Sequence, residues 1–421
     1  MTEHTSPQAL TCDDLPQGTL TVEQARQRIL QPLQALDDRE RLSLRAALGR
    51  ILAAPVKVAF AVPPHRNSSM DGYAFAHADG GQGAQLRIAG VSYAGKPFTG
   101  QLQRGECVRI MTGAVVPDGC DTVEMQENCR RDGEQLQLNT ATRQGANIRH
   151  PGDDMQPGDV ILETGRHLNA ADLGLLAALG ISEVDVLRRP RVAFFSTGDE
   201  LKSIGETLEA GDIYDSNRYT LHAMLQVLDV EIIDMGVVRD TAAAVEQAFR
   251  SAARRADVLI TSGGVSVGDA DYVTATLEKL GQVSFWKMAM KPGKPLAHGR
   301  LGNCLFFGLP GNPVSVMATF LLFVRPAILR LRGEGPAALE LPEWPALAAA
   351  PLKKEVGRKE YQRGISHQDA EGRWQVRSTG KQESHMLRSM SQANCFIVLE
   401  RDSGDLPAGS PVKIIPFQGL L

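Results

Sequence analysis

Residues 257–269 read DVLITSGGVSVGD, and residues 304–315 read CLFFGLPGNPVS. In both stretches a short apolar run, of the length of a buried strand, leads into a loop of glycines and hydroxyl side chains. Glycines let backbone N–H groups converge, and a helix that follows such a loop points its positive end at a bound anion. One such loop is common in proteins that bind nothing there. Two loops that flank Lys287 and the turn 291–295 favour a site for phosphate or another oxyanion.

From Arg191 onward the chain alternates between strand and helix patterns. We expect strands at 192–195, 231–237, 258–260 and 283–290, and helices at 217–228, 241–255, 271–280 and, after a hairpin, 313–331. This alternation predicts a parallel sheet with helices on both faces, which is a doubly wound α/β domain. Ligands bind outside the carboxyl ends of the strands in such sheets, and both anion loops lie at those ends.

The N-terminal half has a different pattern of expected helices and strands. Thr21 and Gln24 form a capping box for a helix whose apolar face continues to residue 36, with a kink at Pro32. Short alternating strands, such as 85–89 and 107–111, fill residues 56–148 and indicate a β-rich insertion. Helical spacing returns at 169–179, so the first domain is expected to be discontinuous.

The segment 334–351 is rich in Pro, Ala and Leu and is interpreted as a linker to a strand-dominated C-terminal unit, a small barrel or sandwich. The whole chain is therefore predicted to combine α/β and β domains. The predicted divisions are a disordered lead-in (1–17), a discontinuous α+β domain (18–55 and 149–188), a β-rich inserted domain (56–148), a doubly wound α/β domain (189–332) and a C-terminal β domain (333–421).

Composition excludes several classes of protein. The 421 residues are 43% apolar and carry a formal net charge of −4, which gives no electrostatic footprint for nucleic acid or a membrane surface. The six cysteines are scattered without Cys-x-x-Cys spacing, which is typical of reduced thiols in a cytoplasmic protein. The first 20 residues lack an apolar signal core, and the apolar stretch 314–324 is shorter than the roughly 18 residues of a membrane span. We expect a soluble, cytoplasmic protein.

Acidic side chains follow three of the expected strands. Glu200 ends the segment STGDE after the first strand, Asp240 follows the second, and Asp271 follows the loop after the third. Each acid alone is more often a helix cap or a solvated charge. Beside two anion loops, however, clustered carboxylates would repel the ligand unless a cation intervened, and Mg²⁺ held by carboxylates and phosphate oxygens is the usual solution. This pattern predicts magnesium-dependent chemistry on a nucleotide or phosphate.

Six motifs, in this order, resemble one family: SSMDGYA (68–74), MTGA (111–114), STGDEL (196–201), SGGVSVG (262–268), KPGKP (291–295) and GLPGNP (308–313). They are similar to the molybdopterin molybdenumtransferases of the bacterial MoeA type, which are related to the gephyrin E domain. The resemblance covers residues 20 to 421. It implies a MogA-like α/β domain and a reaction in which molybdate and adenylylated molybdopterin, with Mg²⁺, give molybdenum cofactor and AMP.

The resemblance also implies roles for individual residues. The candidates for the molybdate pocket are Lys291, Lys294, Arg363 and Ser384, with Pro295 shaping the turn. The candidates to cradle a phosphate of the adenylate or pterin are Ser262, Gly263, Gly264 and Ser266, and the remaining cofactor-binding candidates are Lys287, Pro310 and Pro313. The candidates for Mg²⁺ coordination or for activating the attacking group are Glu200, Asp240 and Asp271, with the assignment among them open. The catalytic candidates in or beside the β-rich insertion are Asp71, Thr112 and Asp154.

The last three residues can reach the α/β domain only if another domain folds over it. The resemblance implies an elongated homodimer whose cleft joins the β-rich insertion of one subunit to the sheet domain of the other. Other proteins of molybdenum cofactor biosynthesis are further possible partners. Two alternatives stay open: adenylylation of molybdopterin by ATP, because the sheet domain alone resembles the adenylyltransferases, and a non-catalytic scaffold role. The sequence does not distinguish molybdate from tungstate.

Overall fold

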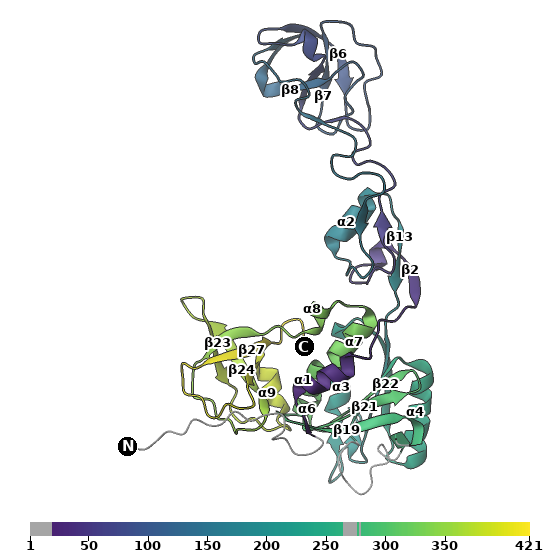
Figure 1. The fold of residues 1–421 in the computed structure, drawn as a ribbon, viewed down its shortest axis with the longest axis vertical. Helices are drawn as coiled ribbons and strands as arrows, with labels where there is room; N and C mark the ends of the chain where they lie inside the picture. Colours follow the sequence, from purple (N-terminus) through teal and green to yellow (C-terminus); the bar gives the residue numbers. More distant parts are fainter. Residues whose placement is uncertain (1–18, 264–275, 278) are drawn as a thin grey trace. The chain divides into compact units, whose positions relative to one another are not determined.

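The computed structural model describes residues 19–263, 276–277 and 279–421 (Figure 1). The chain forms two compact units: one comprises Met1–Arg41 and Asp185–Leu421, and the other comprises Leu42–Val184. Most of the predicted helix 271–280 lies outside the described residues, as do the candidates Gly264, Ser266 and Asp271.

A mixed sheet forms the centre of the larger unit. Within the described residues its order is β1-β19-β21-β22-β18-β14-β17. The strands are β1 (Thr19–Leu20), β14 (Arg191–Thr197), β17 (Glu231–Val238), β18 (Val258–Ser262), β19 (Gln282–Met288), β21 (Pro295–Leu301) and β22 (Cys304–Leu309). The four strands β17, β14, β18 and β22 are parallel, as predicted. The expected hairpin before the helix at 313 is formed by β21 and β22, which a short turn makes antiparallel. The strand expected at 283–290 departs from the parallel pattern, because β19 is antiparallel to β21.

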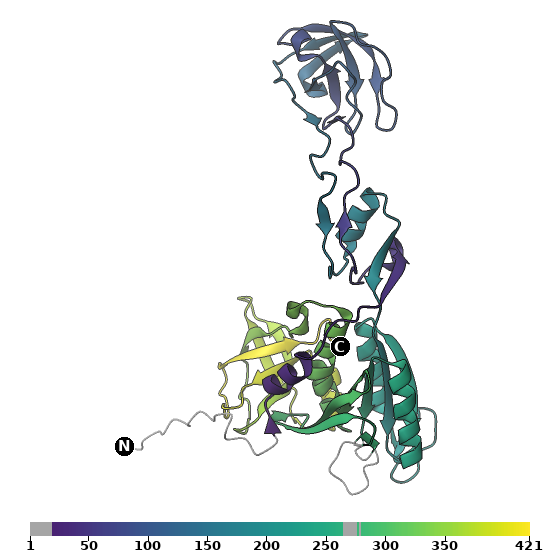
Figure 2. The same ribbon diagram turned by 45° about the vertical axis from the view of Figure 1, so that its right-hand side comes forward.

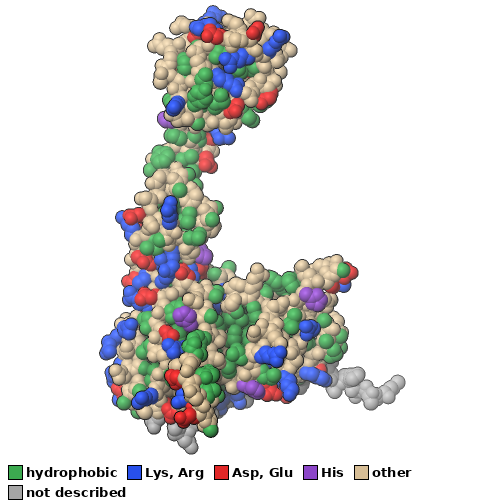
Figure 3. Space-filling view, turned by 180° about the vertical axis from the view of Figure 1, so that it is seen from behind, with side chains coloured by type: hydrophobic (Ala, Val, Ile, Leu, Met, Phe, Trp, Pro, Cys, Tyr) green, Lys and Arg blue, Asp and Glu red, His purple; other side chains and the backbone are tan. Residues whose placement is uncertain are grey.

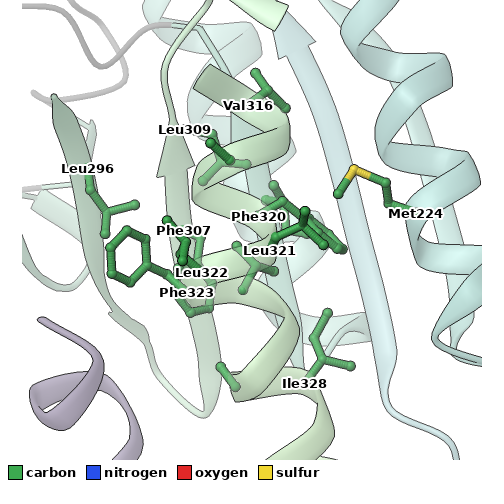
Figure 4. Close-up of a cluster of buried hydrophobic side chains, with 14 of the residues drawn as sticks. Met224, Leu296, Phe307, Leu309, Val316, Phe320, Leu321, Leu322, Phe323 and Ile328 are labelled. Carbon is green, nitrogen blue, oxygen red and sulfur yellow. The ribbon is translucent and has the colours of Figure 1, made fainter. Parts of the chain in front are cut away.

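Helices cover both faces of this sheet (Figures 1 and 2). Alternate residues of β14 define the two faces: Val192 and Phe194 belong to one core, and Ala193 and Phe195 belong to the other. The second core is completed by α4 (Ala242–Arg255). The first core, part of which Figure 4 shows, includes side chains of α1 (Val22–Leu30), α3 (Ser216–Val227), α6 (Pro313–Thr319), a π-helical turn (Phe320–Val324) and α7 (Arg325–Arg332). The doubly wound α/β architecture is confirmed.

Helix α1 begins with the predicted capping box, in which Thr21 accepts a hydrogen bond from the Gln24 N–H and the Gln24 side chain accepts one from the Thr21 N–H. The helix ends at Leu30, so the predicted kink at Pro32 is wrong. A proline disfavours helical geometry in the preceding residue, and here it follows the end of the helix instead of bending it. The apolar face of α1 packs into the core of the larger unit.

One helical stretch, Pro313–Arg332, is long and apolar enough to cross a membrane by length and composition, with a mean hydropathy of 1.7. However, 83% of it is buried inside the protein. A core helix has the same composition, so this stretch is weak evidence for a membrane span.

A closed β-barrel forms the C-terminal part of the larger unit. Its order β24-β25-β23-β27-β26 closes because β24 pairs with both β25 and β26. The elements are β23 (Trp344–Ala348), β24 (Lys359–Gln368), β25 (Trp374–Ser378), β26 (Cys395–Leu399) and β27 (Pro411–Pro416), with α8 (Pro336–Leu339) and α9 (Leu387–Gln392). The predicted barrel is confirmed. The prediction that 334–351 is a linker is wrong, because this segment contains α8 and the barrel strand β23, whose Ala346 and Ala348 are core residues.

The smaller unit contains the predicted β-rich insertion. Its larger sheet has the order β8-β5-β7-β6-β10-β9 within the described residues. The strands are β5 (Gly72–Phe75), β6 (Gln85–Ser92), β7 (Glu106–Ile110), β8 (Thr122–Met125), β9 (Cys129–Asp132) and β10 (Gln135–Leu138). Helix α2 (Ala170–Ala178) is capped by Asn169 and followed by Gly180 with a φ of 71°, as its sequence predicts.

Short elements complete the fold. Two-stranded ladders join β11 (Ile148–Arg149) to β4 (Asn67–Ser68), β12 (Val160–Leu162) to β3 (Val56–Lys57), β13 (Glu183–Leu187) to β2 (Arg39–Ser43) and β15 (Leu201–Lys202) to β16 (Ile213–Tyr214). Single 3₁₀ turns span Leu44–Ala46, His77–Asp79 and Gln126–Asn128. The finer domain boundaries drawn from the sequence stay a prediction.

The surface carries mixed charge. On the face that Figure 3 shows, Lys and Arg side chains are interspersed with Asp and Glu side chains. This distribution agrees with the small net charge of −4.

Candidate active site

A cavity of about 1020 Å³ lies at the carboxyl ends of the parallel strands in the larger unit. Each of four strands contributes a residue that follows it: Gly198 after β14, Asp240 after β17, Gly263 after β18 and Pro310 after β22. The turn 291–295 and the barrel segment 381–385 form the rest of its wall, together with Arg358. The cavity is therefore where a doubly wound fold binds its ligands.

The cavity wall is rich in basic side chains. Lys291 is half-buried and Lys294 is exposed, and both come from the same turn. Gly293 holds this turn against α6: its φ is 102°, and a Cβ there would approach Cγ2 of Thr319 to 2.7 Å. Ammonium groups at the wall of a cavity attract an anion by charge, without a fixed donor geometry.

Two segments from different domains meet at Ser384. The Asn312 side-chain amide donates a hydrogen bond to Oγ of Ser384 (2.9 Å), and the N–H of Val314 donates one to its carbonyl (3.1 Å). Asn312 belongs to the second glycine loop, whereas Ser384 belongs to the barrel. This contact fixes the barrel segment beside the anion loop.

Arg363 does not line the cavity, although the sequence placed it in the molybdate pocket. Its side chain is fully buried, and its guanidinium donates hydrogen bonds to Oγ of Ser389 (2.9 Å) and to the carbonyls of Lys381 (3.3 Å), Gln382 (3.1 Å) and Glu383 (2.9 Å). Burial lowers the pKa of Arg363 to about 10. The guanidinium therefore holds from behind the backbone that presents Ser384 to the cavity.

Two of the three predicted magnesium candidates, Glu200 and Asp240, line the cavity, and Asp271 lies outside the described residues. No cluster of three or more His, Cys, Asp or Glu side chains suited to a metal ion occurs among the residues that the structure describes. Mg²⁺ commonly takes only one or two carboxylates and completes its coordination with water and substrate phosphates. The donor set of Glu200 and Asp240 fits that mode of binding.

A second cavity of about 540 Å³ adjoins the first and shares Thr197, Glu200 and Gly263 with it. Ser262 and Pro313 line this smaller cavity, together with the first residues of α3. The φ of Gly263 is 89°, and a Cβ there would lie 2.7 Å from the carbonyl oxygen of Thr197. Only glycine fits this close approach without displacing backbone.

Asn217 connects the two glycine loops. Its side-chain amide donates hydrogen bonds to Oγ of Ser262 (2.8 Å) and to the carbonyl of Gly311 (2.7 Å). Buried polar atoms gather at these strand ends. Five of them have no hydrogen-bond partner within the described part of the chain: Oγ of Ser196, Oγ1 of Thr197, Oγ1 of Thr261, Oδ2 of Asp215 and Oδ1 of Asn217. Buried polar atoms are costly unless paired, so this region suits a polar ligand.

The other predicted residues of the larger unit have different positions. Pro295 and Pro310 line the larger cavity. Lys287 is exposed on β19 and lines neither cavity.

In the smaller unit, the structure brings Asp71 and Thr112 together. Oδ1 of Asp71 accepts hydrogen bonds from the N–H (2.7 Å) and the hydroxyl (2.8 Å) of Thr112. These bonds, first that of the backbone, lower the pKa of Asp71, and the charge of Arg109 adds to the effect. Asp154 is exposed in a loop, and its backbone N–H donates a hydrogen bond to the Val62 carbonyl (3.0 Å).

Sequence reasoning missed several residues of the larger cavity. Thr197 and Asn312 stand inside quoted motifs, so their motifs marked them without assigning them a role. Arg358 belongs to a stretch of Lys and Arg residues whose composition is ordinary for a solvated surface. Gly198, Pro292, Gly293, Gly311 and Ser315 likewise stand inside quoted stretches without an assigned role, and the remaining missed residues are Met290, Lys381, Gln382, Glu383 and His385. Of the barrel segment 381–385, only Ser384 was a candidate in the sequence analysis.

Comparisons with known proteins agree with this architecture. Three family profiles match in chain order: the MoeA N-terminal region (domain I and II) at residues 20–180, a probable molybdopterin binding domain at 193–330, and the MoeA C-terminal region (domain IV) at 345–417. A molybdopterin molybdenumtransferase of Haemophilus influenzae is 45% identical over 404 residues, which cover 96% of this chain and all of that protein. The chain belongs to the molybdopterin molybdenumtransferase family.

Other members of this family and its relatives are also similar. A molybdopterin molybdenumtransferase of Bacillus subtilis is 31% identical, with 94% of each chain covered. Gephyrin of Dictyostelium discoideum is 33% identical over 94% of this chain and 62% of its own length. A crystal structure titled as a molybdopterin biosynthesis moeA protein from Pyrococcus horikoshii matches with a TM-score of 0.81 at 28% identity and covers 95% of this chain and 99% of that one. The resemblance seen in the sequence is confirmed.

Proposed function

We propose that this molybdopterin molybdenumtransferase family member inserts molybdenum from molybdate into adenylylated molybdopterin and releases AMP. It thereby acts as a transferase in molybdenum cofactor biosynthesis. The observation that carries the proposal is that a single cavity is lined both by Lys291, Lys294 and Ser384 and by the carboxylates Glu200 and Asp240. Such a cavity pairs an oxyanion site with a carboxylate site.

The basic wall suits molybdate, a tetrahedral dianion. Lys291 and Lys294 supply positive charge and N–H donors, and Ser384 supplies a hydroxyl whose position is fixed by Asn312. Pro295 shapes the turn that carries both lysines. Arg363 supports this wall through the segment 381–383.

The carboxylates of Glu200 and Asp240 suit a magnesium-bound diphosphate. Glu200 and Asp240 would hold Mg²⁺, with Asp271 as the third candidate and the assignment among them open. When bound, Mg²⁺ neutralises negative charge on the phosphates and polarises the anhydride that is cleaved. Without a cation these carboxylates would repel the same phosphates.

The smaller cavity suits the phosphate of the adenylate or pterin. Ser262, Gly263 and Pro313 belong to its two glycine loops, and Gly264 and Ser266 continue the first loop in sequence. Pro310 belongs to the larger cavity instead, and Lys287, which the sequence also proposed as cofactor-binding, lines neither cavity because it lies exposed on β19.

We place Asp71, Thr112 and Asp154 of the smaller unit at the cavity of a partner subunit in a cytoplasmic homodimer. The hydrogen-bonded pair of Asp71 and Thr112 supports a joint role, because each residue fixes the other at the surface of its unit. Further proteins of cofactor biosynthesis would deliver the adenylate and receive the product.

The test is AMP release by the purified protein, measured by chromatography, with adenylylated molybdopterin, Mg²⁺ and a series of molybdate concentrations. Molybdate-dependent AMP release supports the proposal, and Lys291→Gln and Lys294→Gln should each raise the KM for molybdate. Lys353→Gln is the matched control, because Lys353 is an exposed lysine of the barrel that pairs with Asp405 (2.6 Å) away from the cavity. Formation of the adenylate from ATP would indicate an adenylyltransferase instead. Neither activity, with intact fold, would indicate a scaffold.

A further inference from the structure

A buried carboxylate lies behind the basic wall of the larger cavity. Glu360 is 1% exposed and does not line the cavity itself. It stands on β24 of the barrel, directly opposite Lys291 on β20 (Met290–Lys291), which pairs with β24 in parallel. Side chains of residues in register lie on the same side of a sheet, so this pairing places the carboxylate and the ammonium together.

The two oxygens of Glu360 have different surroundings. Oε2 accepts a hydrogen bond from the side-chain amide of Gln362 (2.9 Å), which also donates to the carbonyl of Lys353 (2.7 Å). Oε1 is buried and has no hydrogen-bond partner among the described residues, but Nζ of Lys291 lies 3.8 Å away. A carboxylate in this position is costly unless a cation compensates its charge.

The separation of 3.8 Å is too long for a hydrogen bond but short enough for a strong attraction between charges. The charge of Glu360 therefore orients the Lys291 ammonium, but Glu360 accepts no hydrogen bond from it. The exposed fraction of the Lys291 side chain is 38%, so the ammonium reaches the cavity. An incoming anion can accept those donors without displacing the carboxylate.

Another cation near Glu360, Lys354, already makes hydrogen bonds of its own. Nζ of Lys354 donates to the carbonyls of Glu355 (3.0 Å), Arg401 (3.2 Å) and Ser403 (2.8 Å). Burial lowers the pKa of Lys354, and the negative charge of Glu360 opposes that effect. Lys354 thus anchors backbone on the barrel side, and the attraction between Glu360 and Lys291 acts on the cavity side.

We propose that Glu360 is a positioning residue for the oxyanion site: it directs the Lys291 ammonium at the substrate anion from the barrel side. This inference rests on the proposed function, because it assumes that Lys291 binds molybdate. Through Glu360 the barrel would also contribute to the affinity for the anion, although Glu360 does not contact the ligand.

The substitution Glu360→Gln distinguishes positioning from simple repulsion. If Glu360 only repelled the bound anion, removal of its charge would lower the KM for molybdate. If it orders Lys291, the freed lysine must be immobilised on binding, and the KM should rise about tenfold with kcat changed less than about twofold. Equilibrium dialysis with molybdate alone should show the same loss of affinity. Glu343→Gln, which breaks an ion pair with Lys413 on the same barrel (2.7 Å), is the matched control and should change neither value.

A double-mutant cycle shows whether Glu360 acts through Lys291. Glu360→Gln should have no further effect on molybdate affinity in a Lys291→Gln background, whereas an additive loss would overturn the inference. Glu360→Asp keeps the charge and should retain more affinity than Glu360→Gln; equal losses would indicate packing and overturn it. If Lys291→Gln weakens binding but Glu360→Gln does not, this inference alone fails. If Lys291→Gln itself has no effect, the proposed molybdate site fails with it.

Discussion

Arg363 offers a sharp test of how the cavity is built, because a ligand contact and a structural role predict different results. Arg363→Met removes four hydrogen bonds, one to a buried hydroxyl and three to carbonyls of 381–383. The Ser389 hydroxyl keeps its hydrogen bond to the Met386 carbonyl (2.6 Å), so each of the four lost bonds costs about 0.5–1.5 kcal/mol. Release of the buried guanidinium offsets part of this, so we expect a net destabilisation of about 3 kcal/mol.

The assay combines urea unfolding with amide hydrogen exchange. Arg363→Met should lower the free energy of unfolding of the larger unit by the stated amount and should accelerate exchange at residues 381–386. Affinity for molybdate should fall only because Ser384 is no longer held in place. Arg363→Lys keeps the charge but loses the forked donors, so it should loosen the same segment. If Arg363→Met abolished molybdate binding with unchanged exchange at 381–386, the guanidinium would act on the ligand directly and this reasoning would be refuted.

Two further predictions concern the sheet. Gly263→Ala should destabilise the protein by about 2 kcal/mol and weaken binding in the smaller cavity, because of its positive φ and the nearby carbonyl of Thr197. Gly335→Ala is the control, because a Cβ there meets nothing within 4 Å and Gly335 lines neither cavity. Equal unfolding curves for the two variants would contradict the argument. Burial lowers the pKa of His298 from 6.5 to about 4, so the unfolded chain takes up the proton first as the pH falls. The free energy of unfolding is therefore unchanged by His298 above pH 6.5 and falls by about 3 kcal/mol between pH 6.5 and about pH 4. Urea titrations at several pH values should show this loss in the native protein but not in His298→Gln.

Much of the fold could be predicted from local patterns. The strand and helix alternation after Arg191 identified β14, β17 and β18 together with α3 and α4, because each element carries its own periodicity. The capping boxes at Thr21 and Asn169 set two helix starts for the same reason. The pairing of β19 with β21 and the place of β23 in the barrel depend on partners that are distant in the sequence or on a turn of few residues. Composition alone does not encode those pairings.

The residues of the candidate site likewise separate into those that local patterns predict and those that depend on distant contacts. Glycine motifs marked the strand ends at Gly263 and Pro310, because the glycines that such a loop requires are visible in the local sequence. Arg358 and the segment 381–385 reach the cavity only because the barrel closes and docks there. Their residue types are ordinary for a surface, so no pattern in the sequence distinguishes them. Arg363 shows the converse: the family resemblance places it in the molybdate pocket, whereas the structure shows that its guanidinium contacts the Ser389 hydroxyl and the carbonyls of residues 381–383.

The turn between β19 and β21 explains why the cavity forms where it does. The chain leaves the α/β sheet at the end of β19, pairs with the barrel through β20, and returns to the sheet at Pro295, where it pairs with Lys287. The turn 291–295 is thus tied to both domains at once, and its lysines are presented at their junction. Asn312 and Ser384 form a second connection between the sheet and the barrel, so loosening either connection should lower anion affinity without changing the residues that we propose bind the anion. Affinity for the oxyanion is in this view a measure of how firmly the barrel is docked to the sheet.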